Sequence, residues 1–595
     1  MRPTSAAESS EDPSGPRQAS AAGGRAASPS SGEARLRAPR WRLAWPAAVG
    51  ALFLGALALR AVGLKTGLPY VYNADENNHF VPHAIGMFGH SLNPDYLVNP
   101  PAFTYLVHAL YALRWGTDPA TVGNAYATDP TTAFVIARAA AATLGAAAVA
   151  FTAIAAARLF QDRRVGIVAG ALLAVAYLAV HYSHFALNDA PTLAPLSLAL
   201  IGVAGIHRTG RLREYVLAGL ALGVAIATKY TAGILVVTIL AAALTSPVVH
   251  ARVRNLLIAA ALVCAGFAIA NPYALLDHHA FIQGLKTQTD TASGDAGGKL
   301  GLANTSGWLY YAGTSTWGFG WLPSLAALGG AVGLLVRQRK LAAILLPAPL
   351  LLFVYLGNQS RFFSRWMLPI YPLLAILAAW ALVTLLSRIR VRWALAAGAA
   401  LLCLQGLVFS VHDDLVLARA DTRQLARNWL VAHVPAGTKL VVEPVFPDQW
   451  AADVGAFNRA TTSGNRWNKW LTSRSRVAND GTLLRGRGRI VKLEDYERTT
   501  YPALVAKYAK AGFCWVVTGS TQYGRAYADP KQVPQAIAYY ARLRRDADLV
   551  YESRPYGSGT KSVPFSFDFS FNYYPLSYDR PGPEIQVYRL RNCTP

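Results

Sequence analysis

The chain has 595 residues, of which 53% are hydrophobic and only 15% charged, against about 25% charged residues in soluble domains. Apolar runs of about 20 residues recur from position 43 to 411, which excludes a soluble globular protein and predicts a polytopic α-helical membrane protein. The net charge of +24 does not call for nucleic acid as a partner, because most arginines between the apolar runs fall in short connecting loops.

Residues 1–41 are predicted to form a disordered cytoplasmic tail. The first 34 are rich in Ser, Ala, Gly and Pro, without apolar periodicity, and are too polar for a cleaved signal peptide. Basic residues then precede the first apolar run: Arg35, Arg37, Arg40 and Arg42. By the positive-inside rule they place the N-terminus in the cytoplasm.

Residues 42–411 are predicted to form the membrane domain, with about eleven transmembrane helices. The apolar runs cover 43–63, 133–160, 165–182, 190–206, 214–228, 231–248, 255–271, 317–336, 341–356, 366–386 and 393–411. With the N-terminus inside, all five predicted inside loops are basic: Arg163/Arg164, Arg208/Arg211/Arg213, Arg252/Arg254, Arg337/Arg339/Lys340 and Arg388/Arg390/Arg392. The agreement over five loops supports this topology.

Two long connections are predicted on the outer side, at residues 64–132 and 272–316. The first includes short apolar stretches such as 102–113, which predict interfacial helices along the membrane. The second has a Gly-rich middle, 293–298, which predicts a mobile loop. An aromatic cluster follows, read either as an interfacial belt or as a stacking surface for a sugar or an isoprenoid chain: Trp308, Tyr310, Tyr311, Trp317, Phe319 and Trp321.

Residues 412–595 are predicted to be an extracytoplasmic α/β domain. Helical patterns cover 421–433, 501–511 and 533–547, and strand patterns cover 438–443, 513–518 and 584–590. Cys514 and Cys593 lie in this domain and could pair in an oxidising compartment, although the sequence does not establish a disulfide. Cys264 and Cys403 lie in apolar runs and are read as packing residues.

The predicted topology gathers polar side chains at the outer rim of the membrane. They are Asp75, Glu76, His79, His83, Asn99, His181, His184, Asn188, Asp189, Lys229, Arg361 and Arg365. A carboxylate there can take a proton from an acceptor hydroxyl or amine, and we interpret Asp75 as this base. Cations there can hold a phosphate leaving group and stabilise its growing charge.

Each group also has a plainer interpretation. Asp75 and Glu76 could be ordinary loop acids, and Asp189 could cap the fourth span. Asp75, His79 and His83, each four residues apart, could be metal ligands on one helical face, although a further ligand is missing from the pattern. The cations near the ends of spans could extend their charged ends to the lipid headgroups: Arg60, Lys229 and Arg365.

Several short motifs, in order, resemble the GT-C membrane glycosyltransferases, specifically the branch of protein O-mannosyltransferases and lipid A aminoarabinose transferases. The matching segments are Ala74-Asp75-Glu76, Asn99-Pro100-Pro101 with Tyr105, Asn188-Asp189-Ala190-Pro191-Thr192, the run from Gly219 to Gly223 leading to Thr228-Lys229-Tyr230, and Arg365-Trp366-Met367-Leu368-Pro369 with Tyr371-Pro372. Each motif is short, and their order and topology make the set specific. The resemblance covers residues 43–411.

The resemblance implies an inverting sugar transfer from a polyprenyl-phosphate donor at the outer face. Asp75 would be the base, with Glu76 supporting it or contacting substrate. Lys229 and Arg365 would bind the lipid phosphate, and Asp189 would be a second acid lining the cavity. Family members often have His or Lys before the Pro-Pro pair, and Asn99 departs from this pattern. Arg361, Asn99 and His79 complete the expected substrate-binding set.

The predicted enzyme needs no cofactor, and its dependence on a divalent metal stays open. Its expected partners are the donor lipid, the membrane, and an acceptor that is a protein, a lipid or a glycan. Low Lys with high Arg, Ala and Gly favours a bacterial source and hence the inner membrane. Two alternatives are a transporter or flippase of a lipid-linked glycan, and a membrane-anchored binding protein in which residues 412–595 act. Transporters often carry internal repeats and ionisable residues at the bilayer midplane, a pattern that this chain does not show.

Overall fold

The computed structural model describes residues 41–293, 300–302, 305–387, 389, 391, 393–453, 466–470, 476–477, 483–484, 489–490, 496–557, 559–568 and 573–594. By its internal contacts the chain divides into two compact units, Met1–Ala44 and Trp45–Pro595. Most of the predicted tail, the Gly-rich residues 294–299 and three of the predicted inside arginines (Arg388, Arg390 and Arg392) lie outside the described residues.

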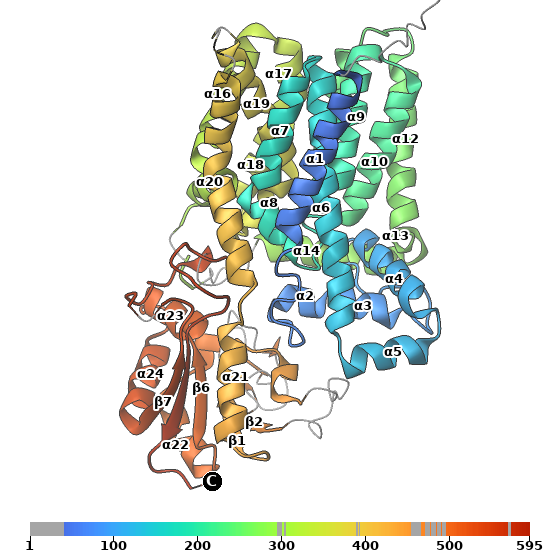
Figure 1. The fold of residues 1–595 in the computed structure, drawn as a ribbon. Helices are drawn as coiled ribbons and strands as arrows, with labels where there is room; N and C mark the ends of the chain where they lie inside the picture. Colours follow the sequence, from blue (N-terminus) through green and yellow to red (C-terminus); the bar gives the residue numbers. More distant parts are fainter. Residues whose placement is uncertain are drawn as a thin grey trace, which may run out of the picture. The chain divides into compact units, whose positions relative to one another are not determined.

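Helical segments form at every predicted apolar run, and they lie side by side in a bundle (Figure 1). In chain order they are α1 (Trp41–Ala61), α6 (Thr131–Phe160), α7 (Arg163–Val175) with α8 (Tyr177–His181) and η1 (Tyr182–His184), α9 (Leu193–Thr209), α10 (Leu212–Thr228), η2 (Tyr230–Leu235) with α11 (Val236–Leu244), α12 (Arg252–Ala270), η3 (Ser315–Gly320) with α16 (Trp321–Arg337), α17 (Arg339–Leu345) with α18 (Pro347–Gly357), η4 (Ser364–Ile370) with α19 (Tyr371–Leu386), and α20 (Ala394–Leu417).

Among the described residues, seven helices are long and apolar enough to cross a membrane, or eight if α7 and the segment after it, bent by 61°, form one span. The chain is therefore a multi-pass membrane protein. Helices α9 and α10 have 17 residues each, so they rise about 26 Å, slightly less than a hydrocarbon core of about 30 Å. The count of eleven spans thus stays a prediction.

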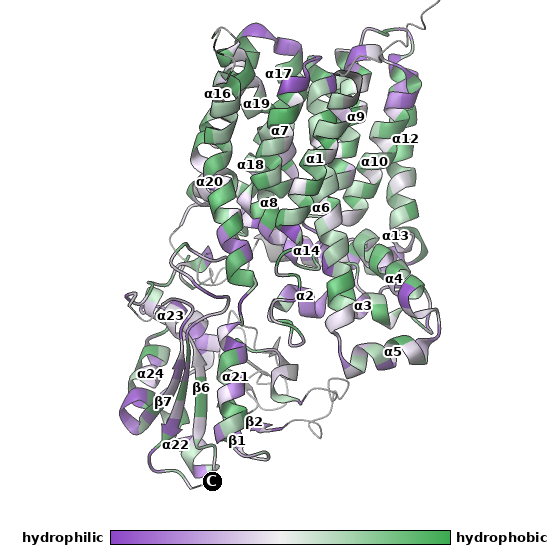
Figure 2. Ribbon diagram, viewed as in Figure 1, coloured by the Kyte–Doolittle hydropathy of each residue, from purple (hydrophilic) through white to green (hydrophobic). Residues whose placement is uncertain are grey.

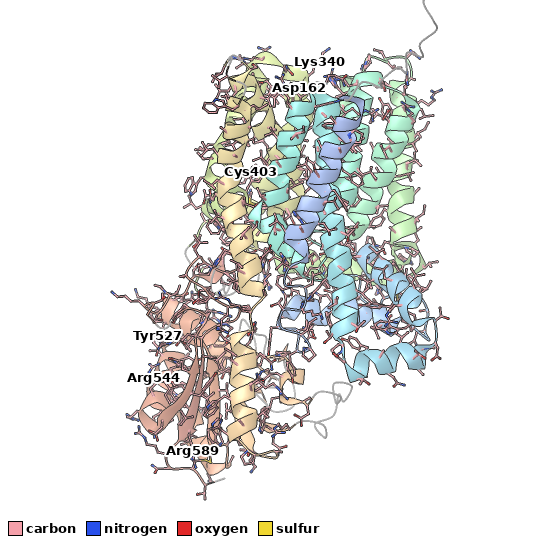
Figure 3. The ribbon with its side chains drawn as sticks, viewed as in Figure 1. Asp162, Lys340, Cys403, Tyr527, Arg544 and Arg589 are labelled. Carbon is pink, nitrogen blue, oxygen red and sulfur yellow. A yellow bond between two sulfur atoms is a disulfide. The ribbon has the colours of Figure 1, made fainter. Side chains whose placement is uncertain are left out.

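The bundle places two predicted inside loops together. Asp162, beside Arg163, and Lys340 lie at the same end of the helices (Figure 3). Hydrophilic residues gather at this end, where α12 and α17 begin, whereas the lengths of the helices are mostly hydrophobic (Figure 2).

Glycines allow α10 to pack closely between α9 and α12. A Cβ atom on Gly202 of α9 would lie 2.6 Å from the backbone nitrogen of Ala218, and one on Gly223 of α10 would lie 2.3 Å from the carbonyl oxygen of Val263. These distances are too short for any side chain, so the backbones meet directly, as is common between membrane helices. This contact holds α10 in place, and Lys229 follows directly after its last residue.

The two predicted outer connections are mostly helical. The first contains α2 (Ala74–Asn78), α3 (Phe80–Gly86), α4 (Ala102–Trp115) and α5 (Pro119–Thr128), and the second contains α13 (Tyr273–Leu276), α14 (His278–Ser293) and α15 (Gly307–Thr314). The helix expected at 102–113 is confirmed as α4, while its position along the membrane stays a prediction.

The C-terminal part contains a five-stranded mixed sheet in the order β2-β1-β6-β8-β7. Strand β1 (Lys439–Val442) is parallel to β2 (Asn468–Lys469) and β6 (Trp515–Gly519), and β8 (Ile585–Leu590) is antiparallel to β6 and β7 (Ala547–Ser553). The helical segments are α21 (Thr422–His433), η5 (Asp448–Ala451), η7 (Tyr496–Thr499), α22 (Ala503–Lys510), α23 (Ser520–Ala528) and α24 (Pro534–Asp546). A second sheet pairs β3 (Arg476–Val477) with β4 (Leu483–Leu484) and β5 (Arg489–Ile490).

The predicted α/β character of the C-terminal part is confirmed. All three predicted helices and all three predicted strands are present within a few residues, whereas α23 and β7 were not predicted. Helix α20 continues to Leu417, past the predicted domain boundary at 411. Cys514 and Cys593 form a disulfide, with their Cα atoms 5.3 Å apart.

Two interpretations of single residues near the outer rim change. Arg60 does not extend to the headgroups: it is fully buried and donates hydrogen bonds to the carbonyl oxygens of Ala56, Leu173 and Ala174. The aromatic cluster does not form one belt either, because some members are buried in the core and others are exposed. The buried members are Tyr310, Tyr311 and Phe319, and the exposed ones are Trp308 and Trp321.

Candidate active site

A cavity of about 650 Å³ opens between the outer connections and the bundle. Seven of the eight residues predicted for the site line it: Asp75, His79, Asn99, Asp189, Lys229, Arg361 and Arg365. They come from α2 and the residue between α2 and α3, from the loops after α3, η1 and α10, from the segment that leads into η4, and from η4 itself. The structure therefore brings together residues that the sequence places up to several helices apart.

Asp75 stands on the first turn of α2, and its side chain is about one third exposed. The side chain of Asn73 caps this helix by accepting hydrogen bonds from the backbone nitrogens of Asp75, at 3.1 Å, and of Glu76, at 3.2 Å. The cap fixes the direction in which the first turn presents its two acids. Asp75 faces the cavity, where its Oδ2 lies 2.6 Å from Nη2 of Arg365.

Glu76, which was expected to support the base or contact substrate, does not line the cavity. It is fully buried, and its two oxygens accept hydrogen bonds from Nε (2.6 Å) and Nη2 (2.7 Å) of Arg138 on α6. The backbone nitrogen of Ala186 donates a further bond to the carboxylate, at 2.8 Å. A bidentate pair of this kind orients α2 against the bundle rather than touching substrate. The two adjacent acids therefore have different surroundings, Glu76 in the packed interior and Asp75 at the cavity.

Lys229 and Asp189 form an ion pair in the same cavity, and both side chains are largely buried. The second oxygen of Asp189 lies 4.0 Å from Nε of Arg365, so Arg365 stands between the two carboxylates. Asp189 thus pairs with cations rather than capping α9, which begins four residues later. The burial of Lys229 and Arg365 is also contrary to the interpretation that they extend to the headgroups.

Aromatic rings hold the guanidinium of Arg365. Its central carbon lies 4.8 Å from the ring centre of Phe363 and 5.7 Å from that of Tyr182. The central carbon of the Arg361 guanidinium lies 5.2 Å from the centre of the same Phe363 ring. Cation–π contacts of this kind are worth about 0.5–2 kcal/mol each, more when the pair is desolvated, and they restrict where the charged groups can point.

Tyr96 also lines the cavity and contacts three of its neighbours, Asn99, His79 and His83. Asn99 donates a hydrogen bond of 2.9 Å to its hydroxyl, and the rings of His79 and His83 stack near it at 5.0 and 4.8 Å. The two imidazoles therefore contact an aromatic ring, and across the described part of the chain no group of three or more His, Cys, Asp or Glu side chains is placed to hold a metal ion. Burial lowers the pKa of His79, which keeps this imidazole neutral at pH 7.

Apolar side chains form the remaining wall of the cavity, beside the charged groups. They include Phe80, Leu187, Ile234, Leu285, Leu352, Leu356 and Trp366. The cavity therefore offers charged groups and hydrocarbon surface together, which suits a ligand that is itself part anionic and part apolar.

The sequence interpretation missed four residues that support the site, namely Arg138, Tyr96, Tyr182 and Phe363. Arg138 carried a usable signal, because a charge within an apolar run needs a buried partner. The aromatic residues carried none, since which rings meet the cations depends on contacts between distant segments.

Residues 129–275 match the family model described as dolichyl-phosphate-mannose-protein mannosyltransferase. No curated protein matches the chain. Among solved structures, apo ArnT from Cupriavidus metallidurans is 15% identical, with a TM-score of 0.45 over 68% of this chain and 83% of that one. The apo oligosaccharyltransferase from Archaeoglobus fulgidus is 12% identical, with a TM-score of 0.48 over 89% and 75%. The family match over residues 129–275 confirms the GT-C resemblance that the motifs predict, in the protein O-mannosyltransferase branch.

Proposed function

We propose that the protein transfers a sugar from a polyprenyl-phosphate donor to an acceptor at the outer face of the membrane, with inversion at the sugar carbon. The observation that carries this proposal is the meeting of Asp75, Asp189, Lys229 and Arg365 in one cavity beside apolar walls. The family model adds support, because its description names a lipid-phosphate sugar as donor.

The charge of the cavity fits a phosphodiester. Two carboxylates, Asp75 and Asp189, stand against three cations, Lys229, Arg361 and Arg365. With His79 neutral, the ionised groups among the described lining residues have a net charge of +1. A donor phosphodiester carries one negative charge, so its binding neutralises the cavity, while the apolar wall accommodates the first part of the isoprenoid chain.

These groups can accept the proton that the reaction releases and stabilise the phosphate that leaves. Asp75 accepts the proton of the acceptor hydroxyl or amine as the acceptor atom attacks the anomeric carbon. The bond between that carbon and the phosphate oxygen breaks, and the polyprenyl phosphate leaves with the electron pair and gains a second negative charge. Lys229 and Arg365 stabilise this charge as it grows, and attack from the face opposite the leaving group inverts the sugar carbon.

The pair between Asp75 and Arg365 gives the donor a further role. While Arg365 neutralises Asp75, the carboxylate is a poor base, because the cation favours its ionised form. A bound phosphate competes for the same guanidinium and leaves Asp75 open to the acceptor. The donor would thereby prepare the base before the acceptor reacts.

The proposal places the N-terminus in the cytoplasm, the cavity and the C-terminal domain outside, and the whole protein in a bacterial inner membrane. Support for this topology is the basic character of the predicted inside loops, two of which, marked by Asp162 and Lys340, lie at the same end of the bundle (Figure 3). The acceptor is a protein, a lipid or a glycan.

Transfer of labelled sugar tests the proposal. Purified protein in lipid nanodiscs would be given polyprenyl-phosphate hexoses and pentoses, with cell-envelope extract as acceptor, with and without chelator. Asp75→Asn should abolish transfer. Asp118→Asn is the matched control, because Asp118 is an exposed acid in the same connection and Asn keeps its helix cap. Full transfer by Asp75→Asn would contradict the assigned base.

The bend of 61° between α7 and α8 favours a transporter as the second candidate, since broken helices line many transport sites. The same preparation in vesicles should then move a fluorescent lipid-linked glycan between leaflets. The enzyme proposal predicts that wild-type protein moves none above the rate of empty vesicles.

A further inference from the structure

The chain between β7 and β8, residues 554–584, is long and contacts the membrane domain. Its described residues reach five separate elements of that domain: α15, η4, η1, α8 and α20. Three of these contacts, two made by Asp568 and one by Tyr573, meet residues close to the cavity. The other contacts lie away from it.

Asp568 holds the first residue of η4. Its Oδ1 accepts hydrogen bonds from the hydroxyls of Tyr310, at 2.7 Å, and Ser364, at 3.1 Å. Ser364 is buried and directly precedes Arg365. The two hydroxyls also lie 2.8 Å from each other, so Asp568, Tyr310 and Ser364 form a small polar cluster next to Arg365 in the chain.

Tyr573 supports the ring on the other side of Arg365. This residue is almost fully buried, and its hydroxyl lies 3.0 Å from that of Tyr182. Tyr182 is the residue whose ring lies 5.7 Å from the guanidinium. The backbone nitrogen of Tyr573 also donates to the carbonyl oxygen of Asp568, at 2.8 Å, so the two contacts belong to one local structure.

We infer that Asp568 and Tyr573 are positioning residues for Arg365, so that the C-terminal domain sets the geometry of the lipid-phosphate site. Asp568 fixes the backbone from which Arg365 projects, and Tyr573 fixes the ring against which its charged end lies. This inference rests on the proposed function, because it assumes that Arg365 binds the donor phosphate. It gives the C-terminal domain a part in donor binding without any contact to the donor itself.

Other contacts of the same connection provide a matched comparison. The backbone carbonyl of Asp579 accepts a hydrogen bond from Arg419, at 2.8 Å, and that of Pro575 accepts one from His412, at 3.0 Å. These contacts attach the connection to the end of α20 and to the residues that follow it, and none of the four residues lines the cavity. Simple attachment of the C-terminal domain would make both groups of contacts equally important for donor binding.

The test measures binding of undecaprenyl phosphate to the full-length protein in nanodiscs, together with the unfolding midpoint. Asp568→Ala removes the shared acceptor, whereas Asp568→Asn retains a carbonyl oxygen in its place. Tyr573→Phe removes only the hydroxyl. Asp579→Ala, in the same connection, removes the contact of 3.7 Å between the carboxylate of Asp579 and Arg419 and is the control.

We expect Asp568→Ala to weaken binding about tenfold, which corresponds to the loss of one positioning hydrogen bond of ordinary strength. Asp568→Asn should restore most of the affinity, Tyr573→Phe should weaken binding by a smaller factor, and Asp579→Ala should bind as wild type. In an Arg365→Lys background, Asp568→Ala should weaken binding by a much smaller factor than in the wild type, because both changes then act on the same contact.

Three outcomes separate the possible failures. If Asp568→Ala weakens binding by the same factor in the wild-type and the Arg365→Lys backgrounds, the inference is overturned, since Asp568 then acts independently of Arg365. Unchanged affinity of Asp568→Ala, with wild-type protein binding well, would overturn it as well. A wild-type protein that does not bind undecaprenyl phosphate would instead contradict the proposed function, and with it the role of Arg365 on which the inference depends.

Discussion

Arg365 and Asp75 join the late part of the membrane domain to its first outer connection, through a contact of 2.6 Å between Nη2 and Oδ2. The same guanidinium lies within 4.0 Å of Asp189, whose other oxygen binds Lys229. A phosphate that enters the cavity meets cations already shared by two carboxylates. Under the proposed function, donor binding and activation of the base would therefore be linked through the side chain of Arg365.

Substitution of Arg365 should impair use of the donor. Lys keeps the charge but loses the planar guanidinium, so we expect Arg365→Lys to lower kcat/KM for the donor about tenfold, and Arg365→Ala to lower it about 100-fold. Steady-state transfer at varied donor concentration measures both effects. Arg164→Lys, at an exposed inside position, is the control and should behave as wild type. Equal activity of Arg365→Ala and wild type would remove Arg365 from the site.

Substitution of Glu76 should destabilise the protein instead. Glu76→Gln leaves the buried charge of Arg138 without its partner, and breaking a buried pair costs about 3–5 kcal/mol. We expect a lower unfolding midpoint in detergent and a smaller folded yield. Asp75→Asn, at the neighbouring and partly exposed position, should keep the wild-type midpoint. A stable Glu76→Gln protein without activity would return Glu76 to the catalytic set.

The two acids show how far the sequence predicts the site. That seven of the eight expected residues would meet at one cavity could be predicted, because polar residues at the ends of apolar runs must lie at an interface. The different surroundings of Asp75 and Glu76 could not be predicted, since they depend on Arg138, which contacts Glu76 of α2 from near the start of a distant apolar run. Likewise, the pairing of Lys229 with Asp189 follows from how α9 and α10 pack, which their composition does not specify.

The fold was predictable to a similar degree. Apolar length predicted the position of each helical segment of the bundle, but not the bend after Val175, because both sides of it are equally apolar. In the C-terminal domain, β7 follows α24 with no intervening turn residue, so its pattern merged with the predicted helix 533–547. The contacts of Asp568 join segments that share no local pattern.

The stability of the C-terminal domain should fall as pH rises. Burial raises the pKa of Glu443 from its ordinary 4.5 to about 8, although Tyr540 and the Gly519 backbone both donate hydrogen bonds to the carboxylate. Between these two values the folded chain retains a proton that the unfolded chain has lost. Stability is therefore greatest below pH 4.5 and declines up to pH 8, by at most about 1.4 kcal/mol per pH unit.

Hydrogen exchange at the amides of β1 and β6 can measure this slope in the full chain. Glu443→Gln, which cannot lose a proton, should show a smaller loss of protection than wild type between pH 5 and 8. Comparison of the two proteins at each pH removes the intrinsic effect of pH on exchange. Identical slopes would show that Glu443 titrates normally.

Loss of the disulfide should destabilise the C-terminal domain. Cys514 and Cys593 are 79 residues apart, and a crosslink that closes a long loop typically contributes about 2–4 kcal/mol. We expect the double variant Cys514→Ala/Cys593→Ala to expose this domain to protease at lower temperature than wild type. The double variant Cys264→Ala/Cys403→Ala removes the two free thiols and is the control. Equal protease resistance of the two double variants would contradict the prediction.

The most direct test of the account measures donor binding and sugar transfer in parallel for Asp75→Asn. Loss of the carboxylate charge frees Arg365, so the account predicts that the variant binds undecaprenyl phosphate at least as tightly as wild type while it transfers no sugar. Retained transfer would show that Asp75 is not the base. Loss of binding together with transfer would show that Asp75 holds the site together rather than carrying out the chemistry.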